Sequence, residues 1–431
     1  MNGQSGIAGD QGRHQMTDST GRINRLVERY RTLAKNAVIL FALRFVQRLL
    51  RLLILYFVVR ALSKESFGEY QFILSCVALM VVFTLPGLNN SVMQSVARGF
   101  AGVYRKAVPR ALAASLAGTA ILIGFGAYHR GAGELGTGFF FAAFLFPFAY
   151  GLEQWRSVRT GREDFAGVFR IDGLAAVALA VLMISGVTQF PGHLLVPLAA
   201  LLGVQTALNT LMTASTFRGI PRDTPVEEGS LRYGARTTFY TAFNTAANQI
   251  DKLLLFYFLS PTALATFYAA ERIPELTKGV VQDVSSVMAP RFAKSDRYTV
   301  GLDKKLRWLG LATGAVVLLA AFAILPWFVP LLFGDKYDDS IPYAQAIMCS
   351  IAIGNTATLR YRYVASKLDE ASSKFVNIGM SLTRIAASLV LVPMYGILGA
   401  VISAFIYRIA ILIVVQIVIK KRYLDSPAGS D

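Results

Sequence analysis

The chain has 431 residues, of which 54% are hydrophobic and only 16% are charged. A soluble protein typically carries about 25% charged residues, so the composition excludes an ordinary soluble domain and indicates an integral membrane protein. The formal net charge is +17, from 43 Lys and Arg against 26 Asp and Glu, and in a membrane protein such cations are expected in cytoplasmic loops, with no nucleic-acid partner.

The sequence lacks the common motifs for metal binding, nucleotide hydrolysis and serine hydrolysis. Cys76 and Cys349 lie inside apolar runs and give no disulfide framework, and the isolated histidines have no metal-ligand spacing. Neither G-x-x-x-x-G-K-[ST] nor G-x-S-x-G occurs. We therefore expect no cofactor, no metal site and no enzymatic activity on these templates.

The N-terminal segment and the apolar runs set the expected order of elements. Residues 1–21 are rich in Gly, Ser, Asp and Gln and are expected to be disordered. We expect residues 22–35 to form an amphipathic interfacial helix. Apolar windows of about 20 residues then predict twelve transmembrane helices. Their expected limits are 36–62, 67–90, 107–128, 135–157, 165–187, 193–217, 234–259, 261–290, 306–333, 341–366, 372–394 and 396–419.

Charges in the connecting segments predict the orientation. With the N-terminus inside, the inner segments carry about 28 Lys and Arg and the outer segments about 4. This asymmetry places both termini in the cytoplasm. The outer connections are also very short, so no external catalytic domain is expected.

A weak internal repeat predicts the fold. Leu53–Phe57 resembles Leu254–Phe258, and Ser91–Met93 matches Ser286–Met288. Such a duplication predicts an all-α membrane protein with two pseudo-symmetric six-helix bundles around a central cavity. The expected parts are an N-terminal lobe at 36–217, a cytoplasmic linker at 218–233, a C-terminal lobe at 234–419 and a cytoplasmic tail at 420–431.

Three arginines and a glutamine share one face of the first span: Arg44, Gln47, Arg48 and Arg51. A charge near the centre of a lone helix costs at least about 2.5–3.5 kcal/mol per arginine. Helical rise places Arg51 near mid-bilayer, whereas Arg44 and Arg48 could instead reach inner-leaflet head groups. We predict that this stripe makes the cavity cationic, because a guanidinium forms bidentate hydrogen bonds with phosphate oxygens.

The seventh span carries the repeat-related polar residues. The repeat aligns Lys252 with Arg51 and Asn248 with Gln47, so each lobe would present a cation to a central anion. The alternative is that Asp251 and Lys252 pair with charges on neighbouring helices, and Asp251 could equally be the counter-charge of Arg51.

The eighth span carries a second charged group. Glu271 and Glu275 lie one turn apart in an apolar setting and are candidates for proton or cation coupling. Arg272 and Lys278 are further candidate cavity cations. The alternative is an internal network of i, i+3 pairs, Arg272 with Glu275 and Glu275 with Lys278.

Predictions also cover the other intramembrane arginines and the prolines. Arg384 and Arg408 fall near mid-depth in the last two spans, and Arg360 is expected to reach lipid head groups. Prolines that can break helices where a rocking motion needs it are Pro86, Pro147, Pro274 and Pro326.

Five ordered motifs give a family resemblance over residues 36–420. They are Phe67–Tyr70, Asn248–Lys252, Phe267–Arg272, Met288–Arg291 and Pro393–Ala400. Together they resemble the Wzx-type polysaccharide flippases of the MOP superfamily, which also includes MATE exporters and lipid II flippases. The resemblance implies a two-lobed transporter that flips undecaprenyl-pyrophosphate-linked oligosaccharide, for O-antigen or exopolysaccharide synthesis, across the bacterial inner membrane. The implied partners are that substrate, membrane lipids, and a polymerase and other glycan-assembly proteins.

Three other functions stay open at this point. A MATE-like cation-coupled exporter should place carboxylates in the first-lobe cavity, where the arginine stripe would repel a cationic drug. A glycan polymerase or ligase usually needs a large external loop, which the predicted topology lacks. A non-transporting scaffold would leave the intramembrane charges without a use.

Overall fold

The computed structural model describes residues 46–294, 298–366 and 370–421. The predicted disordered segment 1–21, the predicted amphipathic helix 22–35 and Arg44 lie outside the described residues. Most of the predicted tail, 422–431, also lies outside them.

Every regular element of the described chain is helical. The first helix is described over residues 46–61. The elements that follow are α2 (Lys64–Met80), η1 (Val81–Thr84), α3 (Gly87–Ala97), α4 (Gly102–Tyr128), α5 (Glu134–Tyr150), α6 (Gln154–Gly161), α7 (Phe165–Gln189), α8 (Leu195–Arg218), α9 (Ser230–Phe258), α10 (Pro261–Lys294), α11 (Val300–Ala323), α12 (Leu325–Phe333), η2 (Asp335–Ser340), α13 (Ile341–Ser366), α14 (Glu370–Tyr395) and α15 (Ile397–Ile419).

Short polar side chains begin several of these helices. Ser63 accepts a hydrogen bond from the Ser66 backbone N–H at the start of α2, and Asp164 caps α7 in the same way. Thr299 caps α11. Each cap satisfies a backbone donor that the first helical turn leaves unpaired.

Two of the four prolines interrupt helices as predicted. Leu85, with φ of 55°, and Pro86 separate η1 from α3, so the second span bends at this point. Pro326 lies in the first turn of α12, just after α11 ends. By contrast, Pro147 lies in the last turn of α5 and α10 continues through Pro274, because neighbouring helices can compensate a missing backbone donor.

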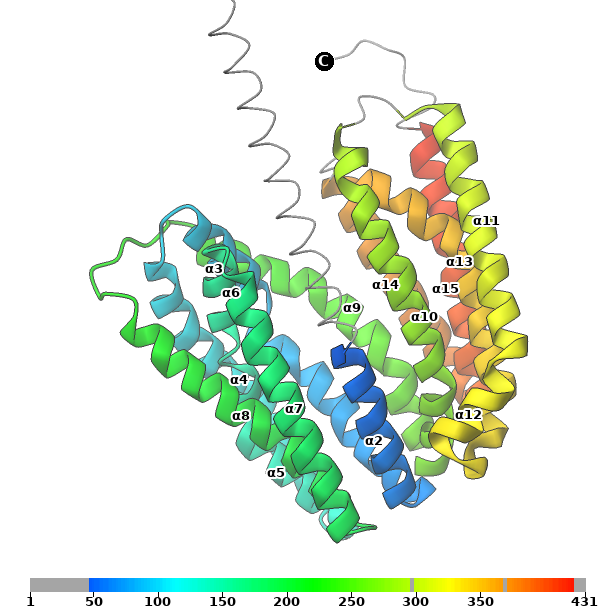
Figure 1. Ribbon diagram of the computed structural model, residues 1–431, viewed down its shortest axis with the longest axis horizontal. Helices are drawn as coiled ribbons and strands as arrows, with labels where there is room; N and C mark the ends of the chain where they lie inside the picture. The colour runs from blue at the N-terminus through cyan, green and yellow to red at the C-terminus, as the bar shows by residue number, and fades with distance from the viewer. Residues whose placement is uncertain (1–45, 295–297, 367–369, 422–431) are drawn as a thin grey trace, which may run out of the picture.

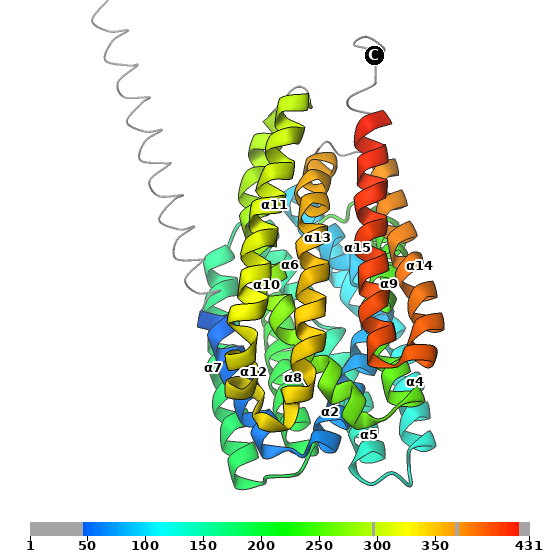
Figure 2. The ribbon, with the colours of Figure 1, turned by 90° about the vertical axis from the view of Figure 1, so that its right-hand side faces the viewer.

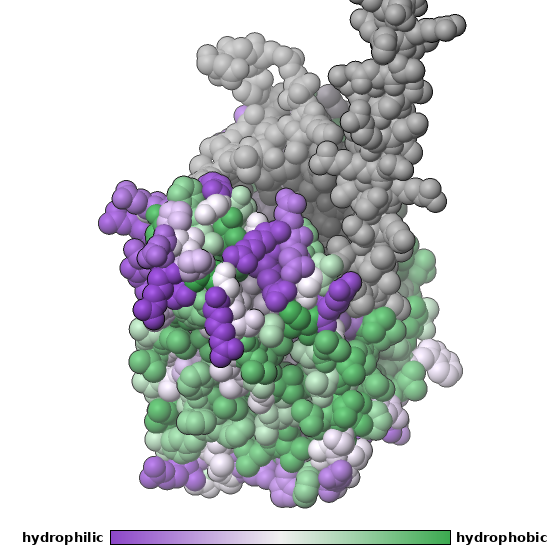
Figure 3. All heavy atoms as spheres, turned by 60° about the vertical axis from the view of Figure 1, so that its left-hand side comes forward, coloured by the Kyte–Doolittle hydropathy of each residue, from purple (hydrophilic) through white to green (hydrophobic). Residues whose placement is uncertain are grey.

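The described surface and helix lengths are those of a multi-pass membrane protein. Eight helices of the described residues are long and apolar enough to cross a membrane. Large apolar side chains are exposed on α4, α5 and α7, among them Leu116, Phe144, Leu174 and Val181. Figure 3 shows this apolar surface as a band between two polar rims, which is the pattern expected of a lipid-facing surface.

The helices gather on two sides of the molecule. α4 packs on α5, and α8 packs on both α5 and α7, whereas α13 packs on α11 and α15, and α15 packs on α14. Figure 1 shows these sets as separate groups, with α9 passing between them, and in Figure 2 the second set lies in front of the first. α9 contacts α3, where Thr238 Oγ1 accepts from the Gly87 backbone N–H at 2.9 Å, and it also packs on α14.

The two groups meet tightly at one end, here called the closed end, through α2, which packs on α5, and α10, which packs on α13. A Cβ atom on Gly68 would lie 1.9 Å from the Pro261 carbonyl oxygen, so α2 and α10 touch through their backbones. The rings of Phe72 and Phe256 stack with centroids 3.7 Å apart. From here the ribbons draw apart toward the opposite end, here called the diverging end (Figure 1).

Candidate functional site

The first helix uses one face for two different purposes. Leu55, Val58 and Leu62 are buried at spacings of three and four residues. The same series continues back to Arg51 and Arg48, which therefore share that face. Arg51 is exposed and Arg48 is half-buried. The stripe is apolar where it packs at the closed end and cationic toward the diverging end.

The Lys336 side chain ties the first helix to η2 at the closed end. The Lys336 ammonium donates to the carbonyl oxygens of Val59 and Leu62 at 2.8 and 2.7 Å. These are carbonyls of the last helical turn, which lack intrahelical partners and attract a cation. Burial and the positive charges of Arg60 and Lys64 lower the pKa of Lys336.

A second polar link lies beside it. Lys64 Nζ is 2.7 Å from the Asp339 carboxylate, which also accepts from Thr266 Oγ1 at 3.0 Å. Lys64 sits 5.2 Å from the Tyr337 ring centroid, and the Phe67 ring meets Tyr337 edge-on at 6.1 Å. Residues from α2, α10 and η2 thus join in one cluster that closes this end.

The predicted residues of the seventh and eighth spans meet in an ion-pair cluster, defined as Asn248, Asp251, Lys252, Glu271 and Arg384. Lys252 Nζ is 2.9 Å from Glu271, and Arg384 Nη2 is 2.9 Å from Asp251. Arg384 Nη1 also donates to Asn248 at 3.2 Å. Asp251 is only 1% exposed, so its partner is needed to offset the cost of burying a charge.

A cavity of about 290 Å³ opens beside this cluster, and we call it the C-terminal cavity. It lies among α9, α10, α13, α14 and α15. Its lining residues are Asn248, Gln249, Lys252, Glu271, Pro274, Glu275, Ile347, Ser350, Ile351, Arg384, Ala404, Tyr407 and Arg408. The cavity therefore combines three cations with two carboxylates.

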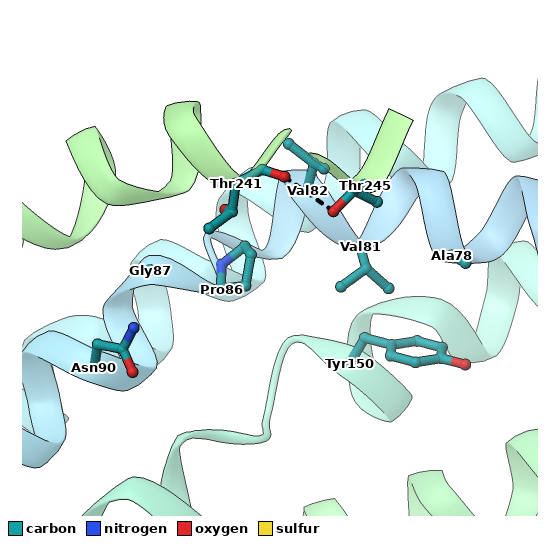
Figure 4. Close-up of a pocket in the computed structure, with 9 residues that line it drawn as sticks. All are labelled: Ala78, Val81, Val82, Pro86, Gly87, Asn90, Tyr150, Thr241 and Thr245. Atoms are coloured by element: carbon teal, nitrogen blue, oxygen red, sulfur yellow. Dashed lines mark hydrogen bonds between the residues drawn. The ribbon is translucent and has the colours of Figure 1, made fainter. Parts of the chain in front are cut away.

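A second cavity of about 330 Å³ lies at the bend of the second span and has a different lining. Figure 4 shows Val81, Pro86 and Tyr150 on one side and Thr241 and Thr245 of α9 on the other. The described residues that line it include no charged side chain. Its chemistry is apolar with a few hydroxyl and amide groups, so it offers no ionic recognition.

The alternative pairings predicted from sequence are present. Asp251 and Lys252 both pair with charges on neighbouring helices. The suggestion that Asp251 is the counter-charge of Arg51 is wrong, because Asp251 pairs with Arg384 and Arg51 forms no ion pair with any described residue. Gln47 lies beside Arg48 and is half-buried.

The eighth-span charges divide between two kinds of partner. Arg272 pairs with Glu275 at 3.4 Å along α10, as the i, i+3 alternative predicts. Glu271 instead reaches across to Lys252 on α9. The side chain of Lys278 lies outside the described residues.

The sequence did not predict the surroundings of Arg384 and Arg408. Arg384 and Arg408 were singled out only by depth, although both line the C-terminal cavity. The prediction that Arg360 reaches lipid head groups is wrong. Arg360 is 3% exposed and its Nε donates to Asp303 at 2.8 Å.

The chemistry available in the described residues is electrostatic. They hold no group of three or more His, Cys, Asp and Glu side chains placed to bind a metal ion. The carboxylates around the C-terminal cavity contact cationic side chains instead. Such a site can recognise a charged ligand by hydrogen bonds and ion pairs.

A family model described as polysaccharide biosynthesis protein matches residues 33–296 of the chain. This match covers more than half of the chain and confirms the family resemblance predicted from the motifs. A search of curated proteins finds no match.

Solved transporters share the fold. A multidrug resistance MATE family transporter of the MOP superfamily in its inward-facing conformation aligns with a TM-score of 0.66 at 14% identity, covering 87% of this chain and 94% of that chain. The lipid II flippase MurJ in an inward closed conformation aligns with a TM-score of 0.65 at 14% identity, covering 89% and 88%. An outward-facing MATE family transporter gives 0.54 at 15% identity, covering 89% and 92%.

Proposed function

Because the chain belongs to the polysaccharide biosynthesis protein family, we propose that it is a flippase for undecaprenyl-pyrophosphate-linked oligosaccharide. It moves the repeat unit from the inner to the outer leaflet of the bacterial inner membrane, where O-antigen or exopolysaccharide is assembled. The sugar and pyrophosphate cross between two lobes while the lipid tail stays in the bilayer. The fold likeness to a lipid II flippase supports this proposal.

The proposed architecture is twelve membrane-crossing helices in two six-helix lobes, at 36–217 and 234–419. The cytoplasmic linker 218–233 joins them. The separate packing of α4, α5, α7 and α8 and of α11, α13, α14 and α15 supports the division. The first helix and α9, which carry the repeated segment, then begin the two lobes.

The proposed orientation places both termini in the cytoplasm, so the closed end is periplasmic. The excess of Lys and Arg in the predicted inner segments supports this. The molecule would then be open toward the cytoplasm, where a lipid-linked substrate is made. The higher TM-score against the inward-facing than against the outward-facing MATE structure, 0.66 against 0.54, agrees.

The observation that carries the proposal is the stripe on the first helix. Arg51 is exposed on the face that packs at the closed end, and it forms no ion pair with any described residue. A guanidinium without a carboxylate partner inside a membrane calls for an anionic ligand, and a pyrophosphate offers the oxygens that a guanidinium binds best. Arg44, Gln47 and Arg48 extend the same binding surface in this proposal.

The ion-pair cluster supplies the proposed coupling residues. Protonation of Glu271 or Asp251 would release Lys252 or Arg384 to the substrate, and Glu275 holds Arg272 in the same way. The membrane potential can also act on an anionic substrate directly, at about 2.3 kcal/mol per charge per 100 mV.

The test compares variants of the stripe in cells. Arg48→Ala and Arg51→Ala are expected to abolish surface polysaccharide while the protein still inserts in the membrane. Arg110→Ala, an exposed arginine on α4, is the matched control and should leave the polysaccharide unchanged. A normal amount of surface polysaccharide in both stripe variants would contradict the proposal.

The alternative is a MATE-like exporter of small cations, which the fold likeness at a TM-score of 0.66 favours. Transport of an ethidium-like cation by purified protein in liposomes would replace the flippase proposal with this one. We expect no such transport, because Arg48 and Arg51 repel a cation from the first lobe.

A further inference from the structure

The C-terminal cavity holds one more positive charge than its carboxylates match. Each carboxylate in or beside it has a cationic partner: the pairs are Glu271 with Lys252, Asp251 with Arg384 and Glu275 with Arg272. Arg408 lines the same cavity and forms no ion pair with any described residue. The described charges around the cavity therefore leave one guanidinium unmatched.

Packing holds this unmatched guanidinium in place. The Arg408 guanidinium carbon lies 5.4 Å from the Tyr407 ring centroid, and that of Arg384 lies 5.9 Å from the same centroid. The Arg408 stem rests on Gly354, where an added Cβ would lie 2.7 Å from Cδ. Two cations thus share one ring in the membrane interior, and of the two only Arg384 has carboxylate partners among the described residues. An anion beside Arg408 would offset the cost of burying its charge.

A second donor in the same cavity also lacks a partner. Arg384 uses its terminal nitrogens for Asp251 and Asn248. Its Nε is buried and has no hydrogen-bond partner among the described residues. A buried donor left unpaired costs about 1–3 kcal/mol, which a bound acceptor would recover.

We propose that the C-terminal cavity binds an oxyanion of the phosphate class between Arg408 and Arg384. The planar guanidinium of Arg408 would bind two of its oxygens, and Arg384 Nε would donate to a third. The assignment of this oxyanion to the pyrophosphate of the transported lipid rests on the proposed function, whereas a free phosphate ion offers the same chemistry. This site is separate from the first-helix stripe, so the proposed substrate path would contain two anion-binding sites.

The experiment measures binding of inorganic pyrophosphate to the full chain purified in detergent, by titration calorimetry. Arg408→Gln is expected to weaken binding at least tenfold. Arg408→Lys keeps the positive charge but loses the planar guanidinium, so its affinity for pyrophosphate should lie between those of the wild type and Arg408→Gln. Gly354→Ala displaces the arginine stem without changing charge and should also weaken binding. Arg110→Gln on the α4 surface is the matched control and should bind as the wild type does.

The proposed site is wrong if the wild-type protein does not bind pyrophosphate. It is also wrong if Arg408→Lys and Gly354→Ala both bind pyrophosphate as tightly as the wild type does. These two variants keep the test valid where Arg408→Gln fails to fold. If a short-chain prenyl pyrophosphate binds more tightly than inorganic pyrophosphate, the site exists and its ligand is a lipid pyrophosphate. If the two bind equally, the site exists and its ligand is a free anion. The assay needs no glycan, so failure of the flippase proposal in cells leaves its result unaffected.

Discussion

The two ends of the interface between the helix groups are built from different chemistry. At the closed end, backbones touch at Gly68 and Pro261 and aromatic rings stack at Phe72 and Phe256. Toward the diverging end, the same face of the first helix presents the exposed Arg51. One end is closed by packing contacts, and the other presents a guanidinium that forms no ion pair with any described residue.

In the proposed flippase, one helix would serve both packing and recognition. The residues from Arg48 to Leu62 at this spacing lie on a single face of the helix, and only their chemical type changes along it. A transporter that alternates between two openings needs a seam that closes on one side while binding groups face the other. The following substitutions test whether the closed end bears the stability that this division requires.

The largest effect is expected from the aromatic stack. Phe72 is fully buried, so Phe72→Ala should lower the free energy of unfolding by about 3–5 kcal/mol. Phe144, which is 73% exposed on α5, provides the control, and Phe144→Ala should change it by less than about 0.5 kcal/mol. Denaturant unfolding in detergent measures both. Equal effects would show that the closed end is not a packed interface.

The backbone contact should give the next largest effect. In Gly68→Ala the new Cβ would push α2 away from Pro261, and such overpacking costs about 1–3 kcal/mol. A cysteine at the buried Thr266 should then react faster with an impermeant maleimide. Gly203→Ala on α8, where an added Cβ meets no atom within 4 Å, should leave the labelling rate unchanged. Unchanged labelling in Gly68→Ala would contradict the tight closure.

The ion pair at the closed end should contribute less. Lys64 and Asp339 are partly exposed, at 22% and 54%, so their coupling should be about 0.2–1 kcal/mol. A double-mutant cycle with Lys64→Gln and Asp339→Asn measures it, and added salt should reduce it. A salt-independent coupling well above this range would mean that charge, and not packing, closes this end.

The smallest effect is expected in the connection between α8 and α9. Hydrogen bonds from Ser95 and Arg98, at 2.5 and 2.8 Å, lower the pKa of Glu227 below its ordinary value of 4.5. This contact therefore stabilises the fold above pH 4.5 and is lost as the pH falls through the lowered pKa. The protection of the amides of residues 224–230, corrected for the intrinsic pH dependence of exchange, should fall with acid in the wild type. Glu227→Gln should remove that dependence. An acid response that survives in Glu227→Gln would assign it to another group.

Apolar length predicted the helices well because a bilayer fixes how long each span must be. The window 165–187 corresponds to α7 at Phe165–Gln189, and 396–419 to α15 at Ile397–Ile419. Pro86 indicated the bend of the second span. Nothing in the sequence indicated that Leu85, directly before it, adopts a left-handed backbone conformation. Local sequence sets where a helix is weak, and tertiary contacts decide whether it breaks.

The candidate site was less accessible from sequence, because the partners are far apart in the chain. Depth alone showed that Arg384 and Asp251 would be costly to bury, and it wrongly placed Arg360 among the lipid head groups. It did not show that Arg384 pairs with Asp251 across 133 residues, or Arg360 with Asp303 across 57. Only the packing of α9 on α14 and of α11 on α13 brings these charges together.

The most direct test of the flippase account is the lipid that accumulates when the protein is absent. Lipid extracts of a deletion strain, examined by mass spectrometry, should contain polyprenyl-pyrophosphate-linked oligosaccharide well above the level in the parent strain. Re-expression of the wild-type chain should clear it, and re-expression of Arg48→Ala/Arg51→Ala should not. A deletion strain with no accumulated lipid-linked sugar and normal surface polysaccharide would contradict the account.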